Sequence, residues 1–169
     1  MWKRMALALC LALLTVGTAG ARAQIIAGSA EDKAFQAISA TEGDKKVQLL
    51  LDFEKQFPQS KILSDVYLLL MEAYRAKNDN AKVNEFGEKC LKVDPNNVTA
   101  LMAVARGYGM ERKNLPQAVQ YAQRAVDSVA KMKDQPPPPQ FSEDQWKQYL
   151  ESTDAAAKGI LNWVKSIRP

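Results

Sequence analysis

Residues 66–97 read VYLLLMEAYRAKNDNAKVNEFGEKCLKVDPNN. Apolar side chains recur at steps of three and four residues on both sides of the polar run at residues 77–80, whose residue types favour turns and caps. The first apolar stripe consists of Val66, Tyr67, Leu70, Met71 and Tyr74, and the second of Val83, Phe86, Cys90, Leu91 and Val93. Pro95 ends the second stripe, because proline lacks an amide hydrogen and disfavours helical backbone in the residue before it. The stretch therefore predicts two helices joined by a short turn.

The same plan recurs on both sides of this stretch. Downstream, the two stripes consist of Leu101, Val104, Ala105 and Tyr108, then of Ala118, Val119, Ala122, Ala125, Val126 and Val129. We expect the turn between them at residues 109–114. Upstream, Ser29 is placed to cap a helix, and a second upstream stripe runs from residue 47 to residue 57. Prolines at positions 58, 95 and 136 punctuate the intervals, and spacings of this size indicate a repeat architecture.

A proline run at residues 136–139 precedes a last helical segment. Ser142 and Gln145 have the spacing of a capping box, and Trp146, Tyr149 and Leu150 follow at helical steps. We expect residues 135–141 to be a stiff spacer, and a polyproline ligand is the alternative. Strand periodicity is absent from the sequence, so the expected fold class is all-α.

The N-terminus has the layout of a secretory signal peptide. Lys3 and Arg4 precede the apolar run ALALCLALLTV, and small residues follow, so cleavage is expected between Ala23 and Gln24. The apolar run is shorter than the roughly 18 residues that a membrane-spanning helix needs, so we expect no transmembrane span after cleavage. An uncleaved anchor is the alternative.

Removal of residues 1–23 also changes the electrostatics. This segment contains three basic residues and no acid, so its loss leaves 20 basic and 19 acidic residues and lowers the net charge from +4 to +1. Nothing then indicates the clustered positive face that nucleic acid requires.

Side chains for catalysis or metal binding are scarce. The chain has no histidine, which excludes His-based acid–base catalysis and the usual zinc sites. Cys90 lies on an apolar stripe, so we expect a buried thiol rather than a reactive one. Asp65 and Glu72 are seven residues apart on one predicted helix, and we interpret them as a solvated face rather than a catalytic pair. Enzyme activity, a cofactor and a metal are not expected.

The stretch at residues 66–97 and its downstream copy resemble the tetratricopeptide repeat, a helix–turn–helix unit of about 34 residues. The family's pattern falls on Tyr67, Leu70, Tyr74 and Pro95, whereas Met71 stands where the family has glycine. The preceding FPQS at residues 57–60 is similar to the variant in exported bacterial envelope proteins, such as outer-membrane assembly lipoproteins and periplasmic coordinators of cell division.

The resemblance implies a fold and a function. The fold would be a right-handed α-solenoid of about three units over residues 24–134, followed by the spacer and by a C-terminal helix at residues 142–169 as a partial fourth repeat. The function would be a non-enzymatic scaffold in the periplasm or outer cell envelope, which binds a protein or peptide through its concave face.

In the family, the first helix of each unit lines the concave groove. Here this implies a groove formed by Asp65, Leu68, Glu72, Arg75, Thr99, Met102, Arg106 and Met110. Arginine forks suit carboxylates, and methionines adapt to varied partners. An ordinary solvated face is the alternative. Leu68 and Glu72 stand where the Lys/Asn clamp of chaperone-binding members would begin, so we do not expect binding of cytosolic chaperone tails.

The last helical segment carries more apolar side chains than one face of a terminal helix needs. Trp146, Tyr149 and Trp163 either dock on the preceding helices or form a patch for self-association. The alternative function is therefore a structural envelope protein that forms a homodimer through its C-terminal helix.

Overall fold

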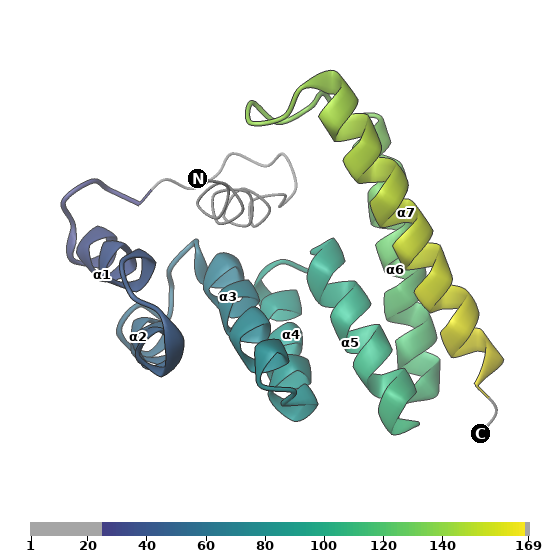
Figure 1. The fold of residues 1–169 in the computed structure, drawn as a ribbon, viewed down its shortest axis with the longest axis horizontal. Coiled ribbons are helices and arrows are strands. Elements are labelled where there is room, and N and C mark those ends of the chain that lie inside the picture. Colours follow the sequence, from purple (N-terminus) through teal and green to yellow (C-terminus); the bar gives the residue numbers. More distant parts are fainter. Residues whose placement is uncertain (1–24, 168–169) are drawn as a thin grey trace, which may run out of the picture.

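The computed structural model describes residues 25–167, and Figure 1 shows its fold. The expected signal peptide, residues 1–23, lies outside the described residues. Within them, the elements in chain order are α1 (Ala30–Ser39), α2 (Gly43–Gln56), α3 (Leu63–Ala76), α4 (Asn80–Val93), α5 (Val98–Glu111), α6 (Leu115–Lys133) and α7 (Glu143–Ser166). The described part of the chain contains no strand, which confirms the all-α prediction.

Local signals set the helix ends as expected. The Ser29 hydroxyl accepts a hydrogen bond from the backbone N–H of Asp32 at 3.1 Å and caps α1. At the start of α7, Ser142 Oγ accepts from the Gln145 N–H at 3.2 Å, and Gln145 Oε1 accepts from the Ser142 N–H at 3.0 Å. The predicted capping box is therefore confirmed. α4 ends at Val93, two residues before Pro95.

Each helix packs mainly on its neighbours in sequence. α3 packs on α4, α4 on α5 and α5 on α6, while α7 covers α6 and part of α5. α1 and α2 pack on each other, and α2 joins this pair to α3. Figure 1 shows the result as a row of helices in chain order from α1 to α7. This arrangement, in which each element is buried by the next, is consistent with an α-solenoid.

The pairs α3–α4 and α5–α6 repeat one plan. Residues 66, 67, 70 and 71 of α3 are buried, and so are residues 100, 101, 104 and 105 of α5, each 34 places later. Tyr74 stacks on Phe86 of its own pair with ring centroids 5.5 Å apart, and Tyr108 packs on Tyr121 of the next pair at 6.4 Å. These tyrosines therefore occupy equivalent places in the two pairs.

Two glycines allow α4 and α5 to approach closely. A methyl group at Gly87 would lie 2.5 Å from Cγ2 of Val104, and one at Gly107 would lie 1.8 Å from Oδ1 of Asn84. Both distances are well inside van der Waals contact, so the crossing requires a residue without a side chain on each helix.

The turn that we expected at residues 109–114 begins later than predicted, because residues 109–111 are helical. α5 continues to Glu111, and Gly109 is part of this helix. A methyl group at Gly109 would lie 2.7 Å from Cζ3 of the Trp163 indole, so this glycine is where α7 approaches α5. The left-handed residues that end the helix and start the next are Arg112 and Asn114.

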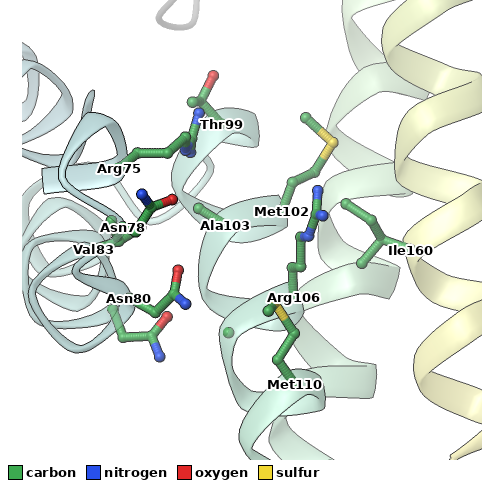
Figure 2. Close-up of a pocket in the computed structure, with 12 residues that line it drawn as sticks. Arg75, Asn78, Asn80, Val83, Thr99, Met102, Ala103, Arg106, Met110 and Ile160 are labelled. Atoms are coloured by element: carbon green, nitrogen blue, oxygen red, sulfur yellow. The ribbon is translucent and has the colours of Figure 1, made fainter. Parts of the chain in front are cut away.

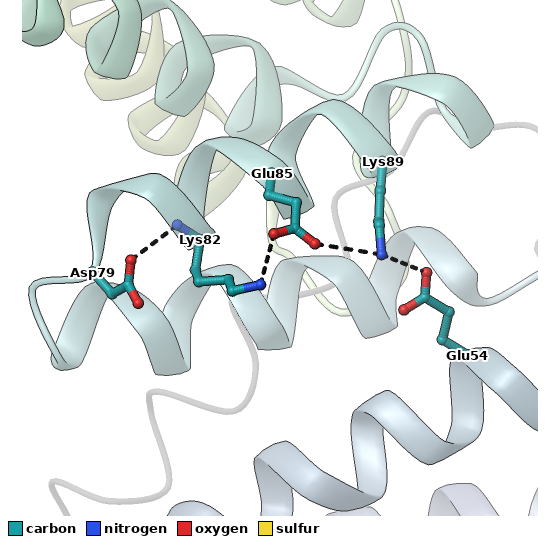
Figure 3. Close-up of polar contacts among 5 residues, drawn as sticks. All are labelled: Glu54, Asp79, Lys82, Glu85 and Lys89. Carbon is teal, nitrogen blue, oxygen red and sulfur yellow. Dashed lines mark hydrogen bonds and ion pairs between the residues drawn. The ribbon is translucent and has the colours of Figure 1, made fainter.

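Carboxylates on the second helix of one pair fasten it to the next pair. Glu54 of α2 accepts a hydrogen bond from the Tyr67 hydroxyl at 3.1 Å and lies 2.9 Å from Lys89 Nζ. Glu88 of α4, 34 residues later, accepts from the hydroxyls of Tyr108 and Tyr121 at 2.8 and 3.1 Å. Figure 3 shows the Glu54–Lys89 ion pair next to the ion pairs that Glu85 forms with Lys82 and Lys89 along α4.

The C-terminal helix docks on the chain itself. Its buried residues are Trp146, Leu150, Ala157, Leu161 and Val164. Lys133 of α6 places Nζ 2.9 Å from Oδ2 of Asp154 and so ties α6 to α7, while Lys158 of α7 pairs with the same oxygen at 2.9 Å. Among residues 25–167, no helix is both long and apolar enough to span a bilayer.

Candidate binding site

A cavity of about 450 Å³ opens beside α5, between the α3–α4 turn and α7. Figure 2 shows its lining residues: Arg75, Asn78, Asn80, Val83, Asn84, Thr99, Met102, Ala103, Arg106, Gly107, Met110 and Ile160. This volume is in the range of pockets that hold small ligands.

Helix α5 supplies one wall of the cavity. Thr99, Met102, Arg106 and Met110 follow one another at steps of three and four residues, which places them on one face of the helix. The remaining faces of α5 pack on α4, α6 and α7. Met110 keeps 55 % of its surface exposed, so this wall is open to solvent and apolar in part.

The α3–α4 turn forms the opposite wall. Arg75 lies in the last turn of α3, Asn78 follows with a φ of 57°, and Asn80 begins α4. Asparagine tolerates this left-handed conformation better than most residues. The Asp79 carboxylate accepts a hydrogen bond from the Lys82 backbone N–H at 3.0 Å and caps α4. The side-chain amides of Asn78 and Asn80 have no partner within residues 25–167 and face the cavity.

Asn84 forms part of the cavity floor where α4 crosses α5. Its Nδ2 donates to Oε1 of Glu111 at 3.1 Å, while its Oδ1 is buried and has no hydrogen-bond donor. The amide lies against the backbone of Gly107, as the short distance to a methyl group at that position shows. The floor is therefore held by one hydrogen bond and one close packing contact.

The cavity is positively charged. Arg75 and Arg106 are its charged lining residues, and neither guanidinium pairs with a carboxylate anywhere in the described residues. The nearby carboxylate of Glu111 is already engaged, by Asn84 and by Lys113 at 3.5 Å. The lining residues thus offer positive charge, amide groups and apolar surface.

Five of the eight residues that we expected in a groove come together in this cavity. They are Arg75, Thr99, Met102, Arg106 and Met110. The other three, Asp65, Leu68 and Glu72, lie earlier on α3 and do not line it, and Leu68 is buried in the core. The difference arises because α5 packs on α4, so that Val83 and Asn84 of α4 form the wall where α3 was expected.

The remaining lining residues have weaker signals in the sequence. Asn78 and Asn80 have the residue types of a turn, and no sequence pattern shows that a turn will border a cavity. Ile160 belongs to the apolar pattern of the last helix, but its position at the cavity depends on how α7 docks on α5. Gly107 could have been found only by knowing which helix crosses α5 there.

The other residues considered as sites have structural roles in the described chain. Cys90 is fully buried, and burial raises the pKa of its thiol to about 12. Trp146 is buried and stacks on Tyr149 with ring centroids 5.4 Å apart near the start of α7. Trp163 lies near the other end of α7 and keeps 39 % exposure. The three aromatic residues named for self-association therefore do not form one surface.

Comparison of the chain with known protein families, with curated proteins and with solved structures found no match.

Proposed function

We propose that the protein is a non-enzymatic scaffold that binds a protein or peptide segment at the cavity beside α5. The observation that carries this proposal is the pair Arg75 and Arg106, two unpaired guanidiniums that line one cavity together with the exposed Met110 and the half-buried Met102. Elsewhere the chain pairs buried or half-buried carboxylates with lysines, as at Glu54 and Asp154. Cationic donors left open beside adaptable apolar surface suit a partner that brings its own carboxylate.

We also propose that α3–α4 and α5–α6 are tetratricopeptide-type units of a right-handed solenoid. This is supported by the 34-residue recurrence of buried positions in α3 and α5 and by the equivalent ring contacts of Tyr74 and Tyr108. α7 would be the first helix of a fourth unit, since it packs on α5 as well as on α6. The protein would act in the periplasm or outer envelope, a proposal that rests on the sequence of residues 1–23.

The test is affinity capture from an envelope extract with the tagged full chain. The Arg75→Glu/Arg106→Glu variant reverses both charges in the cavity. Lys61→Glu/Lys92→Glu is the matched control, because it reverses two exposed charges away from the cavity. We expect the wild type and the control to retain the same proteins and the arginine variant to lose them. Recovery of the same proteins by all three would refute the site.

A second candidate function is self-association through the C-terminal helix. Trp163 and Met110 are large apolar side chains that remain exposed on α7 and α5, and such residues favour a partner surface. Sedimentation equilibrium of the full chain and of Trp163→Ser distinguishes the two functions. A monomer at all concentrations would exclude the homodimer, whereas a dimer lost in Trp163→Ser would support it.

A further inference from the structure

We propose that the cavity binds an extended peptide segment in which an acidic side chain lies next to an apolar one. This inference rests on the proposed function and specifies its partner. It follows from three properties of the lining: two unpaired arginines, a methionine–isoleucine surface and two amides without partners. Each property selects one feature of the bound segment.

The arginines select an acidic side chain. A guanidinium presents its N–H donors in a planar fork that matches the two oxygens of a carboxylate, and such pairs are shorter and stronger than neutral hydrogen bonds. No acid lines the cavity, and Glu111 at its edge is already bound by Asn84 and Lys113. The carboxylate must therefore come from the occupant.

The apolar lining selects the neighbouring residue. Met102 and Met110 of α5 and Ile160 of α7 lie on the side of the cavity that includes Arg106, as Figure 2 shows. Met110 is more than half exposed, so an apolar side chain seated there would remove surface from water. Methionine adapts to side chains of different shape, so leucine, isoleucine, valine and methionine would all be accepted.

The asparagines select an extended backbone. Asn78 and Asn80 each offer an amide donor and acceptor without a partner in the described chain, and these match the N–H and C=O of an extended segment. A helix satisfies its own backbone and would leave them unused.

The experiment is selection from a phage library of random decapeptides on the immobilised full chain. Three proteins are used in parallel: wild type, Arg75→Gln/Arg106→Gln, and the control Lys61→Gln/Lys92→Gln, which also removes two positive charges. We expect the wild type and the control to enrich sequences with Asp or Glu next to an aliphatic residue. The arginine variant should lose that enrichment.

The other outcomes separate this inference from the proposed function. Enrichment of peptides without an acid, lost in Met110→Asp, would overturn the acidic partner and leave peptide binding at the cavity intact. Enrichment that is the same for all three proteins, or none above background, would overturn both. Enriched peptides are then measured by fluorescence anisotropy against their Asn or Gln counterparts. We expect the amide peptides to bind about tenfold to a hundredfold more weakly, as for the loss of a charged hydrogen bond. Equal binding would refute the role of the arginines.

Discussion

Gly107→Ala tests the crossing of α4 and α5 on which the cavity depends. The new methyl group would lie 1.8 Å from Oδ1 of Asn84 and 2.5 Å from its Cγ and Nδ2. Because these atoms cannot remain so close, the Asn84 amide must rotate away. Rotation breaks its 3.1 Å hydrogen bond to Glu111 and forces a buried side chain against its neighbours.

The expected cost follows from these changes. Loss of a hydrogen bond to a charged group costs about 1.5–3 kcal/mol, with the low end appropriate because the side chain of Glu111 is about one third exposed. Overpacking adds about 1–3 kcal/mol, and the better helix propensity of alanine offsets about 1 kcal/mol. We therefore expect Gly107→Ala to lower the free energy of unfolding by about 2–3 kcal/mol.

The measurement is urea unfolding followed by circular dichroism at 222 nm, with the slope checked for unchanged cooperativity. Gly159→Ala is the matched control. Gly159 is an exposed residue inside α7, and a methyl group there has no atom within 4 Å. The same change of residue type should therefore raise the free energy of unfolding by about 1 kcal/mol.

A second variant separates the clash from any other effect of alanine at position 107. Asn84→Ala/Gly107→Ala removes the atoms that the methyl group meets. It should therefore recover the part of the lost stability that overpacking causes, but not the part that the hydrogen bond to Glu111 contributes. The crossing geometry is refuted if Gly107→Ala is as stable as the wild type. It is refuted equally if the double variant is no more stable than the single one.

Three further predictions concern titrating groups. Burial raises the pKa of the Cys90 thiol to about 12. Cys90 should therefore react with a thiol reagent at pH 8 at least about tenfold more slowly in the native chain than in the chain unfolded in urea. Equal reaction rates would contradict its burial. Burial raises the pKa of Tyr67 and Tyr108 to about 12, with Glu54 and Glu88 acting in the same direction, so the tyrosinate absorbance of these two residues should appear near pH 12. The stability that these phenols contribute is complete below pH 10 and is lost as pH rises towards 12, and an ordinary titration near pH 10 would disprove the ties. Hydrogen bonds from Lys133 and Lys158 lower the pKa of Asp154. Asp154→Asn should therefore lower the free energy of unfolding by less than about 1 kcal/mol at pH 7. Urea midpoints of both proteins at pH 7 and below pH 3 should show this difference disappearing as pH falls through the lowered pKa.

The helices could be predicted because their signals act over a few residues. Ser142 and Gln145 satisfy each other's backbone groups within one turn, and Pro95 stops α4 whatever the rest of the chain does. The buried stripes of α3 and α5 follow equally from the periodicity of the sequence. The end of α5 was misplaced because Gly109 has the residue type of a turn, while its actual role is to admit Trp163.

The candidate site could be predicted only where it lies on one helix. Met102, Arg106 and Met110 share a face of α5 by helical geometry alone, so their grouping needed no tertiary information. Which residues face them depends on which helix packs beside α5. Since α4 rather than the middle of α3 takes that place, Glu72 lies away from the cavity and Asn84 lies in it.

The glycines at the crossing connect stability with binding. Gly87 and Gly107 let α4 and α5 touch along the middle of α5, and this contact leaves the neighbouring face of α5 uncovered, with Arg106 and Met110 on it. A methyl group at position 107 would displace the Asn84 amide, which forms part of the cavity floor near Arg106. Gly107→Ala should therefore weaken the binding of acidic peptides beyond what its unfolded fraction accounts for, whereas Gly159→Ala should leave binding unchanged. Equal affinities for both variants, measured where each is fully folded, would show that the cavity does not depend on the crossing.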